Sequence, residues 1–322
     1  MPEGHSIHRI ARQFDANFVG SRAAVTSPQG RFAIGAAEID DMTMTASRAV
    51  GKHLLLQFDD RWLHVHLGLY GAWDFAGEVT TDFSLSRSLR PSAVSAAAGS
   101  SGENEESLHS IGAPRRTRVR MGEQEVDSIL ETWPPEPVGQ VRARILTATA
   151  VADLRGPTVC EVIDEDAVQA LVRRLGPDPL APFETKAEAE ARFAARVQRS
   201  RQPIGQLLMD QSVIAGIGNI YRAEMLFRAG ISPHRTGTSI TDDEASGLWH
   251  DWVKLLRIGV ETGYMLTMDG LRGKRRQAAI DSMDDRHWVY KREGLPCRRC
   301  GTSIALELMQ QRKLYWCPGC QR

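Results

Sequence analysis

The sequence lacks the features of membrane, secreted and disulfide-stabilised proteins. No uninterrupted apolar run approaches the roughly 18–20 residues that a membrane-spanning helix needs. The first five residues, Met1 to His5, form neither a basic nor an apolar segment, so no signal peptide is expected. Only five cysteines occur in 322 residues, too few for a disulfide scaffold. We therefore expect a cytoplasmic protein with reduced thiols and no membrane association.

The chain also lacks net charge. Its 40 Lys and Arg residues balance 40 Asp and Glu residues, which argues against a uniformly basic nucleic-acid-binding protein. The distribution is uneven, however, because residues 271–322 hold 12 Lys or Arg and only five Asp or Glu. This tail carries +7 and the rest of the chain −7. Attraction to phosphates is therefore expected at one face, and it should be sensitive to salt.

Hydrophobic residues make up 42% of the chain, which is enough for packed cores and excludes wholesale disorder. Apolar residues at helical spacing predict a helix from about residue 3 that ends at Gly20. Runs at 54–58 and 62–66, separated by three charged residues, predict a β-hairpin. Further strands are predicted at 141–146 and 158–163, followed by a short helix that ends at the breaker 176–179.

The composition changes between about residues 80 and 138, where Ser, Ala, Gly and Glu dominate. Such a segment cannot build a packed core, so it predicts a mobile insertion. Beyond residue 182 the pattern is mostly helical, with helices predicted at 187–197, 202–210 and 219–229 and a longer one opened by the capping box Thr241–Glu244. The chain thus has a strand-rich first half, a helical second half and a cysteine-rich tail.

The cysteine-rich tail predicts a metal site. Two CxxC pairs, separated by residues 301–316, bring together four thiolates: Cys297, Cys300, Cys317 and Cys320. This spacing is typical of a tetrahedral zinc site of the ribbon type, and the alternative is redox use of either pair. Because all four ligands come from the protein, one zinc ion should stabilise structure and take no part in hydrolysis.

The segment between the two cysteine pairs combines basic and aromatic residues. Arg312 and Lys313 stand next to Tyr315 and Trp316, a combination that suits the backbone and bases of a nucleic acid. The alternative is a ribbon that only caps its domain.

A glycine pair precedes the predicted helix 219–229. Gly216 and Gly218 let the backbone approach a ligand closely and aim N–H groups of a helix N-terminus at an anion, for which a phosphate is the natural candidate. A tight turn between helices explains the same pattern.

The N-terminus offers a candidate nucleophile. If Met1 is removed, the ring nitrogen of Pro2 becomes a secondary amine with a pKa of about 8, partly neutral at cytoplasmic pH. A neutral amine can attack an aldehyde carbon and form an iminium. Glu3 lies beside it as a candidate acid or base. The alternative is that Pro2 and Glu3 simply open a helix.

Taken together, these motifs resemble the Fpg/Nei family of DNA glycosylases. The resemblance rests on residues 1–5, Gly51-Lys52-His53, residues 211–221 and the terminal 315–321, which occur in family order and leave out roughly 80–138. The start Met-Pro-Glu-Gly and the triplet Leu69-Tyr70-Gly71 resemble the bacterial endonuclease VIII branch.

The resemblance implies an α+β fold in three parts. Residues 1–178 would form an N-terminal helix and an antiparallel β-sandwich, 179–285 a helix–two-turn–helix domain and 286–322 the zinc ribbon. The implied function is a bifunctional glycosylase and abasic-site lyase of base excision repair. It would act on oxidised bases in double-stranded DNA, with pyrimidines favoured, by β/δ elimination. We expect a monomer that is associated with the nucleoid through DNA.

The resemblance also assigns roles to single residues. Pro2 would form the Schiff base with the sugar, Glu3 would protonate the ring oxygen and assist elimination, and Lys52 would stabilise a leaving phosphate. Phosphate ligands would be Asn219 and Arg312. Leu69 and Tyr70 would fill the space left by the flipped nucleotide; otherwise they would be a core pair at a strand end. Outside the resemblance, Lys52 would be read as an ordinary surface lysine.

The chain departs from the family pattern at three places. Gly68 replaces a polar residue before Leu-Tyr, Lys313-Leu314 replaces a Ser-Thr pair, and the insertion adds arginines near an acidic run. A different class of function is a non-catalytic zinc-ribbon protein that binds damaged DNA. A third is an unrelated nucleic-acid module with a zinc ribbon. Neither would require the Pro2-Glu3 terminus.

Overall fold

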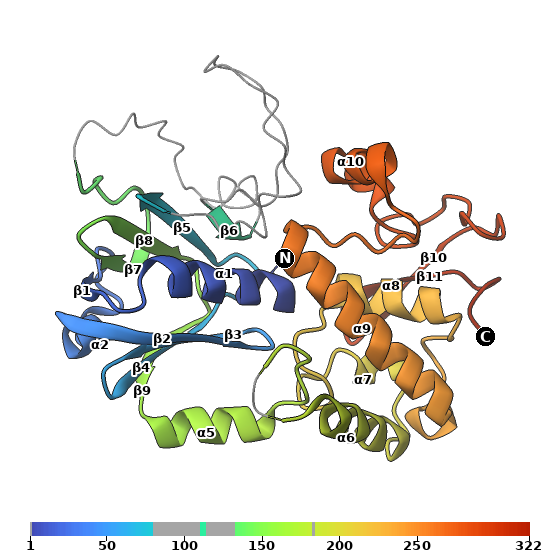
Figure 1. Cartoon of the computed structure of the whole chain (residues 1–322). Helices are drawn as coiled ribbons and strands as arrows, with labels where there is room; N and C mark the ends of the chain where they lie inside the picture. Colours follow the sequence, from blue (N-terminus) through green and yellow to red (C-terminus); the bar gives the residue numbers. More distant parts are fainter. Residues whose placement is uncertain (1, 80–109, 114–132, 182–183) are drawn as a thin grey trace. The chain divides into compact units, whose positions relative to one another are not determined.

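The computed structural model describes residues 2–79, 110–113, 133–181 and 184–322 (Figure 1). Contacts divide the chain into two units. The first contains Pro2 and Ser6–Leu171, and the second contains Glu3–His5 and Val172–Arg322. The domain limits predicted at residues 178 and 285 stay predictions.

The first unit is built on nine antiparallel strands in the order β6-β5-β8-β7-β1-β2-β3-β4-β9. Strand β1 joins two four-stranded halves, because it pairs with β7 on one side and only briefly with β2 on the other. The strands are β1 Arg22–Thr26, β2 Met42–Val50, β3 His53–Phe58, β4 Arg61–His66, β5 Ala72–Gly77, β6 Ser110–Gly112, β7 Val141–Leu146, β8 Ala150–Arg155 and β9 Val159–Ile163.

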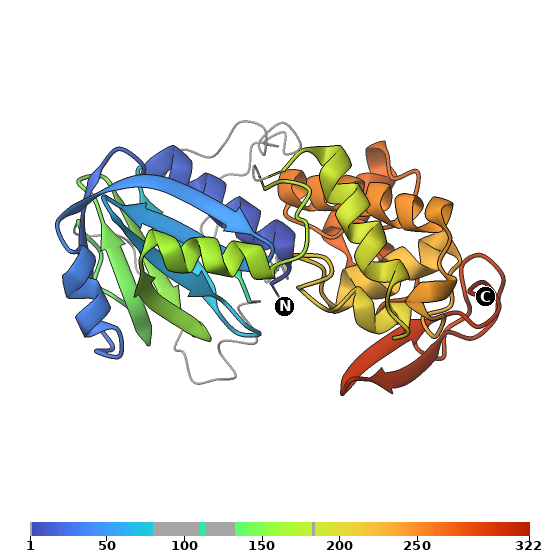
Figure 2. The same cartoon turned by 90° about the horizontal axis from the view of Figure 1, so that it is seen from below.

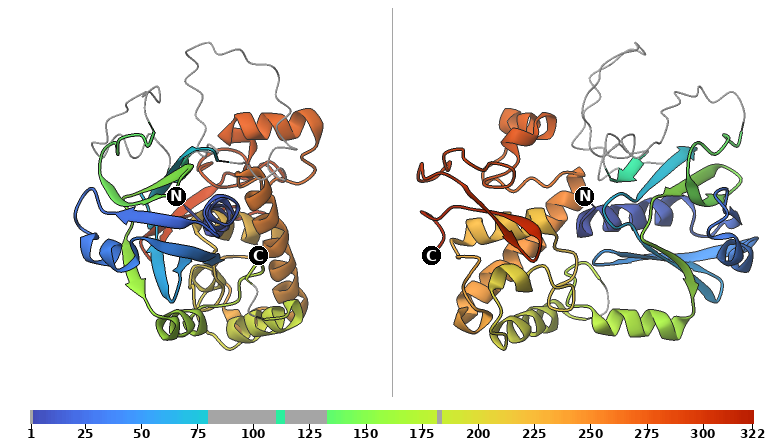
Figure 3. Two further views of the ribbon diagram at one scale, coloured as in Figure 1. Left: turned by 60° about the vertical axis from the view of Figure 1, so that its left-hand side comes forward. Right: turned by 180° about the vertical axis from the view of Figure 1, so that it is seen from behind.

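Helix α1 (Gly4–Asn17) supplies much of the core of this unit. It runs between the two halves of the sheet (Figures 1 and 3), and Phe14 packs on Trp73 and Phe75 with ring centroids 4.9 and 5.3 Å apart. Two further helices belong to the described part of this unit. Helix α2 (Ala33–Ile39) follows β1, and α5 (Glu165–Arg174) follows β9 and lies along the sheet (Figure 2).

Most predicted elements of this unit are confirmed. The N-terminal helix, the hairpin β3–β4 and strands β7 and β9 lie where their patterns placed them. The stretch predicted as a mobile insertion differs in one part, because Ser110–Gly112 pairs with β5 and buries Ile111. Ile111 is the single large apolar residue of Ser110–Gly112, so the sequence there shows no alternation that would predict a strand. The remaining residues 80–109 and 114–132 of that prediction lie outside the described residues.

The second unit is mainly helical in the part of the chain that the structure describes. Its helices are α6 Lys186–Gln198, α7 Ile204–Leu207, α8 Asn219–Ala229, η1 Gly237–Ser239, α9 Asp242–Thr262, α10 Gly273–Asp281 and η2 Met283–Asp285. Thr241 and Glu244 form the predicted capping box of α9. Helix α8 lies centrally in this unit, and its residues from Asn219 to Phe227 are all buried.

The helix predicted at 202–210 is shorter than expected. Only Ile204–Leu207 is α-helical, because the chain then tightens into turns in which Asp210 N donates to Leu207 O. The Asp210 carboxylate accepts from Ser212 N at 2.8 Å and ends the helix locally.

The zinc ribbon consists of the hairpin β10 (Ala305–Met309) and β11 (Arg312–Trp316) with the two cysteine pairs at its ends. Phe227 of α8 packs with Val289, Ile304 and Tyr315 in a shared core. The ribbon is therefore attached to α8 through apolar contacts.

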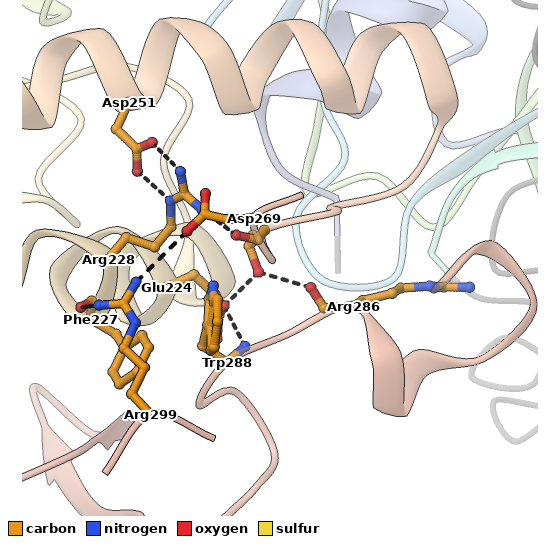
Figure 4. A network of polar contacts seen from close by, with 9 residues as sticks. Glu224, Phe227, Arg228, Asp251, Asp269, Arg286, Trp288 and Arg299 are labelled. Carbon is orange, nitrogen blue, oxygen red and sulfur yellow. Dashed lines mark hydrogen bonds and ion pairs between the residues drawn. The ribbon is translucent and has the colours of Figure 1, made fainter. Parts of the chain in front are cut away.

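A buried carboxylate on α8 adds a polar attachment (Figure 4). Glu224 accepts hydrogen bonds from the backbone N–H groups of Trp288, Val289 and Tyr290 at 2.8–2.9 Å. The Thr267 hydroxyl also donates to it. Four donors from two later segments thus converge on one side chain of α8.

Two arginines extend this network (Figure 4). Arg228 of α8 forms a bidentate pair with Asp251 of α9 and a second pair with Asp269. Arg299, from the first cysteine knuckle, stacks over Phe227 and Trp288 at 4.5 and 4.8 Å. The network therefore connects α8, α9 and the ribbon.

Among the described residues, no helix is both long and apolar enough to cross a membrane.

Candidate active site

The N-terminus of α8 binds the carboxylate of Glu3. Oε2 accepts from Gly218 N and Oε1 accepts from Ile220 N, both at 2.9 Å, and Glu3 is fully buried. The first N–H groups of a helix have no partner within the helix, and Gly218 has no side chain to cap them. Glu3 therefore acts as the cap of a helix that begins more than 200 residues later.

This contact corrects the prediction for the glycine pair. A phosphate was expected at the N-terminus of α8, but the anion held there is the carboxylate of Glu3. Close approach requires the glycine, because a Cβ on Gly218 would lie 2.4 Å from Cδ of Glu3. Likewise Gly4 N donates to Gly216 O at 2.8 Å, and a Cβ on Gly4 would lie 2.9 Å from Cα of Gly216. The glycines thus fit the N-terminal segment against α8.

The side chain of Gln211 makes three hydrogen bonds within the loop before α8. Gln211 Oε1 accepts from Gly216 N at 3.0 Å, and its Nε2 donates to the carbonyl oxygens of Met209 and Ile217. These bonds fix the backbone that presents its N–H groups to Glu3. The predicted stretch 211–221 therefore builds the Glu3 site as a unit.

Asn219, the first residue of α8, ties the helix to the ribbon. Its Nδ2 donates to Lys313 O at 2.8 Å, and its Oδ1 accepts from the buried guanidinium of Arg222. Burial, followed by the charge of Arg312, lowers the pKa of Arg222 to about 10. Arg312 therefore lies near enough to repel Arg222. Roles of Asn219 and Arg312 as phosphate ligands stay predictions.

In the first unit, Lys52 lies in the turn between β2 and β3, after Gly51. The positive charge of Lys52 affects the pKa of His66 at the end of β4. The pKa of His66 is lowered chiefly by burial and further by the charges of Lys52 and His64. Lys52 therefore lies near other basic side chains, and both its role at a leaving phosphate and the alternative of an ordinary surface lysine stay predictions.

Leu69 and Tyr70 lie at the tip of a tight turn after β4. Both are exposed, at 44% and 43%, so the alternative of a buried core pair is wrong. Gly68 has φ +66°, and a Cβ there would lie 2.3 Å from Thr158 Cγ2. A glycine in place of the expected polar residue is thus required by this turn, while a wedge role for Leu69 and Tyr70 stays a prediction.

The four tail cysteines converge as the spacing predicted. Their sulfur atoms all lie within 4.8 Å of one another, with Cys297–Cys320 at 3.8 Å and Cys300–Cys317 at 3.5 Å. A tetrahedron with Zn–S bonds of about 2.3 Å separates its sulfurs by about 3.8 Å. The donor set therefore fits one structural zinc ion.

Comparisons with known proteins identify the family. Three family models match the chain: the formamidopyrimidine-DNA glycosylase N-terminal domain at residues 1–119, the corresponding H2TH domain at 175–269 and a zinc finger found in FPG and IleRS at 294–322. Endonuclease 8 1 of Mycobacterium bovis is 38% identical over 325 residues, and the match covers all of both chains. The chain belongs to the Fpg/Nei family of DNA glycosylases.

Other relatives of this Fpg/Nei protein match in part or at lower identity. The formamidopyrimidine-DNA glycosylase of Thermus thermophilus is 38% identical over 151 residues, which are 47% of this chain and 55% of that protein. The Lactococcus lactis Fpg in a complex with N7-benzyl-Fapy-dG DNA superposes over both whole chains with a TM-score of 0.68 at 19% identity. This likeness confirms the predicted α+β fold. Family membership makes the protein a DNA glycosylase and abasic-site lyase of base excision repair with one structural zinc ion.

Several notable residues of this Fpg/Nei protein were not predicted from the sequence. Arg222 and Glu224 are fully buried charges on α8, and nothing in the helical pattern separates them from ordinary surface residues. His53, His64 and His66 gather on one face of the β3–β4 hairpin. Their alternate spacing at 64 and 66, opposite 53 across a predicted hairpin, was a signal that could have found them.

Proposed function

We propose that this glycosylase removes oxidised bases, with oxidised pyrimidines as the favoured class, from double-stranded DNA, and that it cuts the strand through a Schiff base on Pro2. The anchoring of Glu3 at the N-terminus of α8 carries this proposal. It fixes the backbone immediately after Pro2. The amine that removal of Met1 would produce is therefore held close to a fixed point. Precise placement of a nucleophile is a large part of its reactivity.

The chemistry follows from a secondary amine next to a carboxylate. The Pro2 nitrogen attacks C1′ and the base departs with the electrons of the glycosidic bond. Glu3, placed as a hydrogen-bond acceptor, takes the proton released by the amine and passes it to the ring oxygen as the sugar opens. The iminium then acidifies the C2′ proton. Its removal expels the 3′ phosphate, and a second elimination expels the 5′ phosphate.

The eliminations also require positive charge near the departing phosphates. Lys52 is proposed to stabilise charge on a leaving phosphate, and Asn219 and Arg312 are proposed to bind phosphates around the flipped nucleotide. The +7 charge of residues 271–322 supports attraction of DNA to the second unit. Solved relatives with this fold include complexes with damaged DNA, among them an Fpg complex with DNA that contains an oxidised pyrimidine. We further propose a monomer that acts in the cytoplasm.

Trapping with borohydride tests the Schiff base. Reduction should link the protein, with Met1 removed as verified by mass spectrometry, to duplexes that contain an abasic site or an oxidised base. Pro2→Gly should cleave far more slowly, and Glu3→Gln should lose base excision by about 10²-fold or more, but less of the cleavage of a ready-made abasic site. A correctly processed protein that binds damaged duplex but is never trapped would instead support the non-catalytic alternative.

A panel of duplexes tests the substrate class. Single-turnover excision should be faster on oxidised pyrimidines than on oxidised or ring-opened purines. The reverse order would contradict the pyrimidine assignment while leaving the Pro2 chemistry in place.

A further inference from the structure

Arg222 is a buried cation whose hydrogen bonds all go to uncharged oxygen atoms. It lies in the first turn of α8 and is fully buried. Its guanidinium donates to Oδ1 of Asn219, to the carbonyl oxygen of Lys313 at 3.2 Å and to that of Gly205 at 3.4 Å. Its Nε is also buried and has no hydrogen-bond partner among the described residues. Burial of the charge is therefore only partly compensated within the protein.

The carboxylates nearest in effect to Arg222 are bound by other groups. The pKa of Arg222 is lowered by burial and next by Arg312, while Glu3 and Glu307 raise it. The oxygens of Glu3 accept from backbone N–H groups of α8, and Oε1 of Glu307 lies 2.8 Å from His234 Nε2. Within the described part of the chain, neither arginine forms an ion pair with a carboxylate. Two cations thus lie near one another in an arrangement that favours an anion.

Three hydrogen bonds form a closed triangle between α8 and β11. Arg222 Nη2 donates to Asn219 Oδ1 and to Lys313 O, and Asn219 Nδ2 donates to the same carbonyl oxygen at 2.8 Å. Because a guanidinium only donates and a carbonyl only accepts, the Asn219 amide satisfies both neighbours in one orientation alone. The second N–H of this amide has no acceptor among the described residues. The triangle therefore decides which end of Asn219 meets an incoming acceptor.

The same triangle holds the ribbon strand beside Arg312. Arg312 begins β11 and pairs with Met309 of β10. The next residue, Lys313, supplies the carbonyl oxygen that both side chains of α8 bind. The position of the strand that carries Arg312 is thus set from α8 as well as from its own hairpin.

We propose that Arg222 is a positioning residue for phosphate binding, which orients the Asn219 amide and holds the β11 backbone next to Arg312 so that both side chains meet DNA phosphates in one arrangement. The proposal rests on the proposed roles of Asn219 and Arg312 at phosphates. Arg222 is buried and acts without touching DNA. A bound phosphate would offset the repulsion between the two arginines, so the uncompensated charge becomes favourable in the complex.

The main test measures binding of the zinc-loaded protein to a duplex that contains a tetrahydrofuran analogue of an abasic site. Arg222→Met removes every donor of the guanidinium and should weaken binding by about tenfold or more. The slope of log Kd against log salt should become shallower by up to about 0.9, the effect of one lost phosphate contact. An unchanged Kd and an unchanged slope would overturn the proposal.

Arg222→Lys separates orientation from charge. Lysine keeps the positive charge but replaces the planar fork by a single nitrogen, so it should recover only a minor part of the lost affinity. Full recovery would mean that charge alone matters and would overturn the positioning role. Arg257→Gln removes an exposed charge from α9 and is the control, which should bind within about twofold of wild type. Melting temperature and zinc content are measured for each variant.

Coupling to Asn219 distinguishes positioning from general damage to the fold. If Arg222 acts through Asn219, the double variant Arg222→Met with Asn219→Ala should weaken binding by less than the product of the two single effects. Effects that multiply would contradict the proposal. If Arg222→Met does not fold, Arg222→Lys takes its place in this double variant, with the same two outcomes.

Borohydride trapping on an abasic-site duplex keeps this proposal separate from the Pro2 chemistry. At saturating protein concentration, Arg222→Met should still be trapped. Trapping of every protein, with wild-type affinity and salt dependence in Arg222→Met, would overturn the role of Arg222 alone. Failure of every protein to be trapped, wild type included, would overturn the proposed function.

Discussion

Two buried carboxylates at the same helix show different ways in which backbone N–H groups stabilise a buried charge. Glu3 reaches α8 from the N-terminal segment and accepts N–H groups that the helix cannot satisfy itself. Glu224 projects from α8 and accepts N–H groups of the chain that leads into the ribbon. The first carboxylate caps the N-terminus of α8. The second binds residues 288–290 to the side of α8. In both, backbone donors supply the hydrogen bonds that a buried carboxylate needs.

The largest expected effect comes from removal of Glu224. Glu224→Ala leaves three backbone donors and the Thr267 hydroxyl without their acceptor, which should lower the free energy of unfolding by about 4 kcal/mol. Glu224→Gln should cost about half as much, because one amide oxygen still accepts. Denaturant unfolding of the zinc-loaded protein measures both. Glu261→Gln, at an exposed position of α9, is the control, and equal losses for it and Glu224→Gln would refute the role of the buried charge.

The next effect concerns Glu3 and should appear in activity more than in stability. Gly218→Ala places a methyl group where the Glu3 carboxyl lies, so it should slow abasic-site cleavage by about 10²-fold through displacement of Glu3 and Pro2. Gly247→Ala, on α9 with no atom near the added Cβ, should leave cleavage unchanged and favour the helix by up to about 1 kcal/mol. Full activity in Gly218→Ala would mean that the position of Glu3 is not critical.

The smallest effect is expected for a carboxylate with a cationic partner near the surface. The hydrogen bond from Arg235 is the main cause that lowers the pKa of Glu244 from 4.5, so this group stabilises the fold above that pH and loses its effect as pH falls further. Glu244→Gln should cost about 0.5–1 kcal/mol at pH 7. The difference in unfolding free energy between wild type and variant should shrink below about pH 4.5. A difference that stays constant into acid would contradict an electrostatic origin.

Local patterns allowed much of this molecule to be predicted. Helical spacing located α1 and α8, the capping box located the start of α9, and paired CxxC motifs located the zinc ligands. These features depend on residues close together in the chain, whose spacing is set by the helix or by metal geometry. The resemblance to a family then supplied the roles that spacing alone could not.

Long-range contacts account for what was missed. Nothing near Gly218 indicates that its ligand is residue 3, and so a phosphate was the reasonable expectation. Glu224 looks like any helical glutamate until Val289 and its neighbours are placed beside it. The hydrogen bond between His64 and Glu161 needs the pairing of β4 with β9, which are separated by nearly a hundred residues. Such partners depend on topology, which a periodic pattern does not encode.

The capping of α8 by Glu3 has a consequence for biosynthesis. Glu3 is synthesised long before its partner, because the Ile220 N–H that it binds lies 217 residues later in the chain. At 5–20 residues per second this interval is roughly 10–40 s. During that time the N-terminal segment has no helix to bind, and an aminopeptidase can reach Met1. Once α8 has formed, Glu3 is held and fully buried at its N-terminus. The order of synthesis thus leaves the N-terminal segment accessible to the processing that the proposed role of Pro2 requires, until α8 has formed.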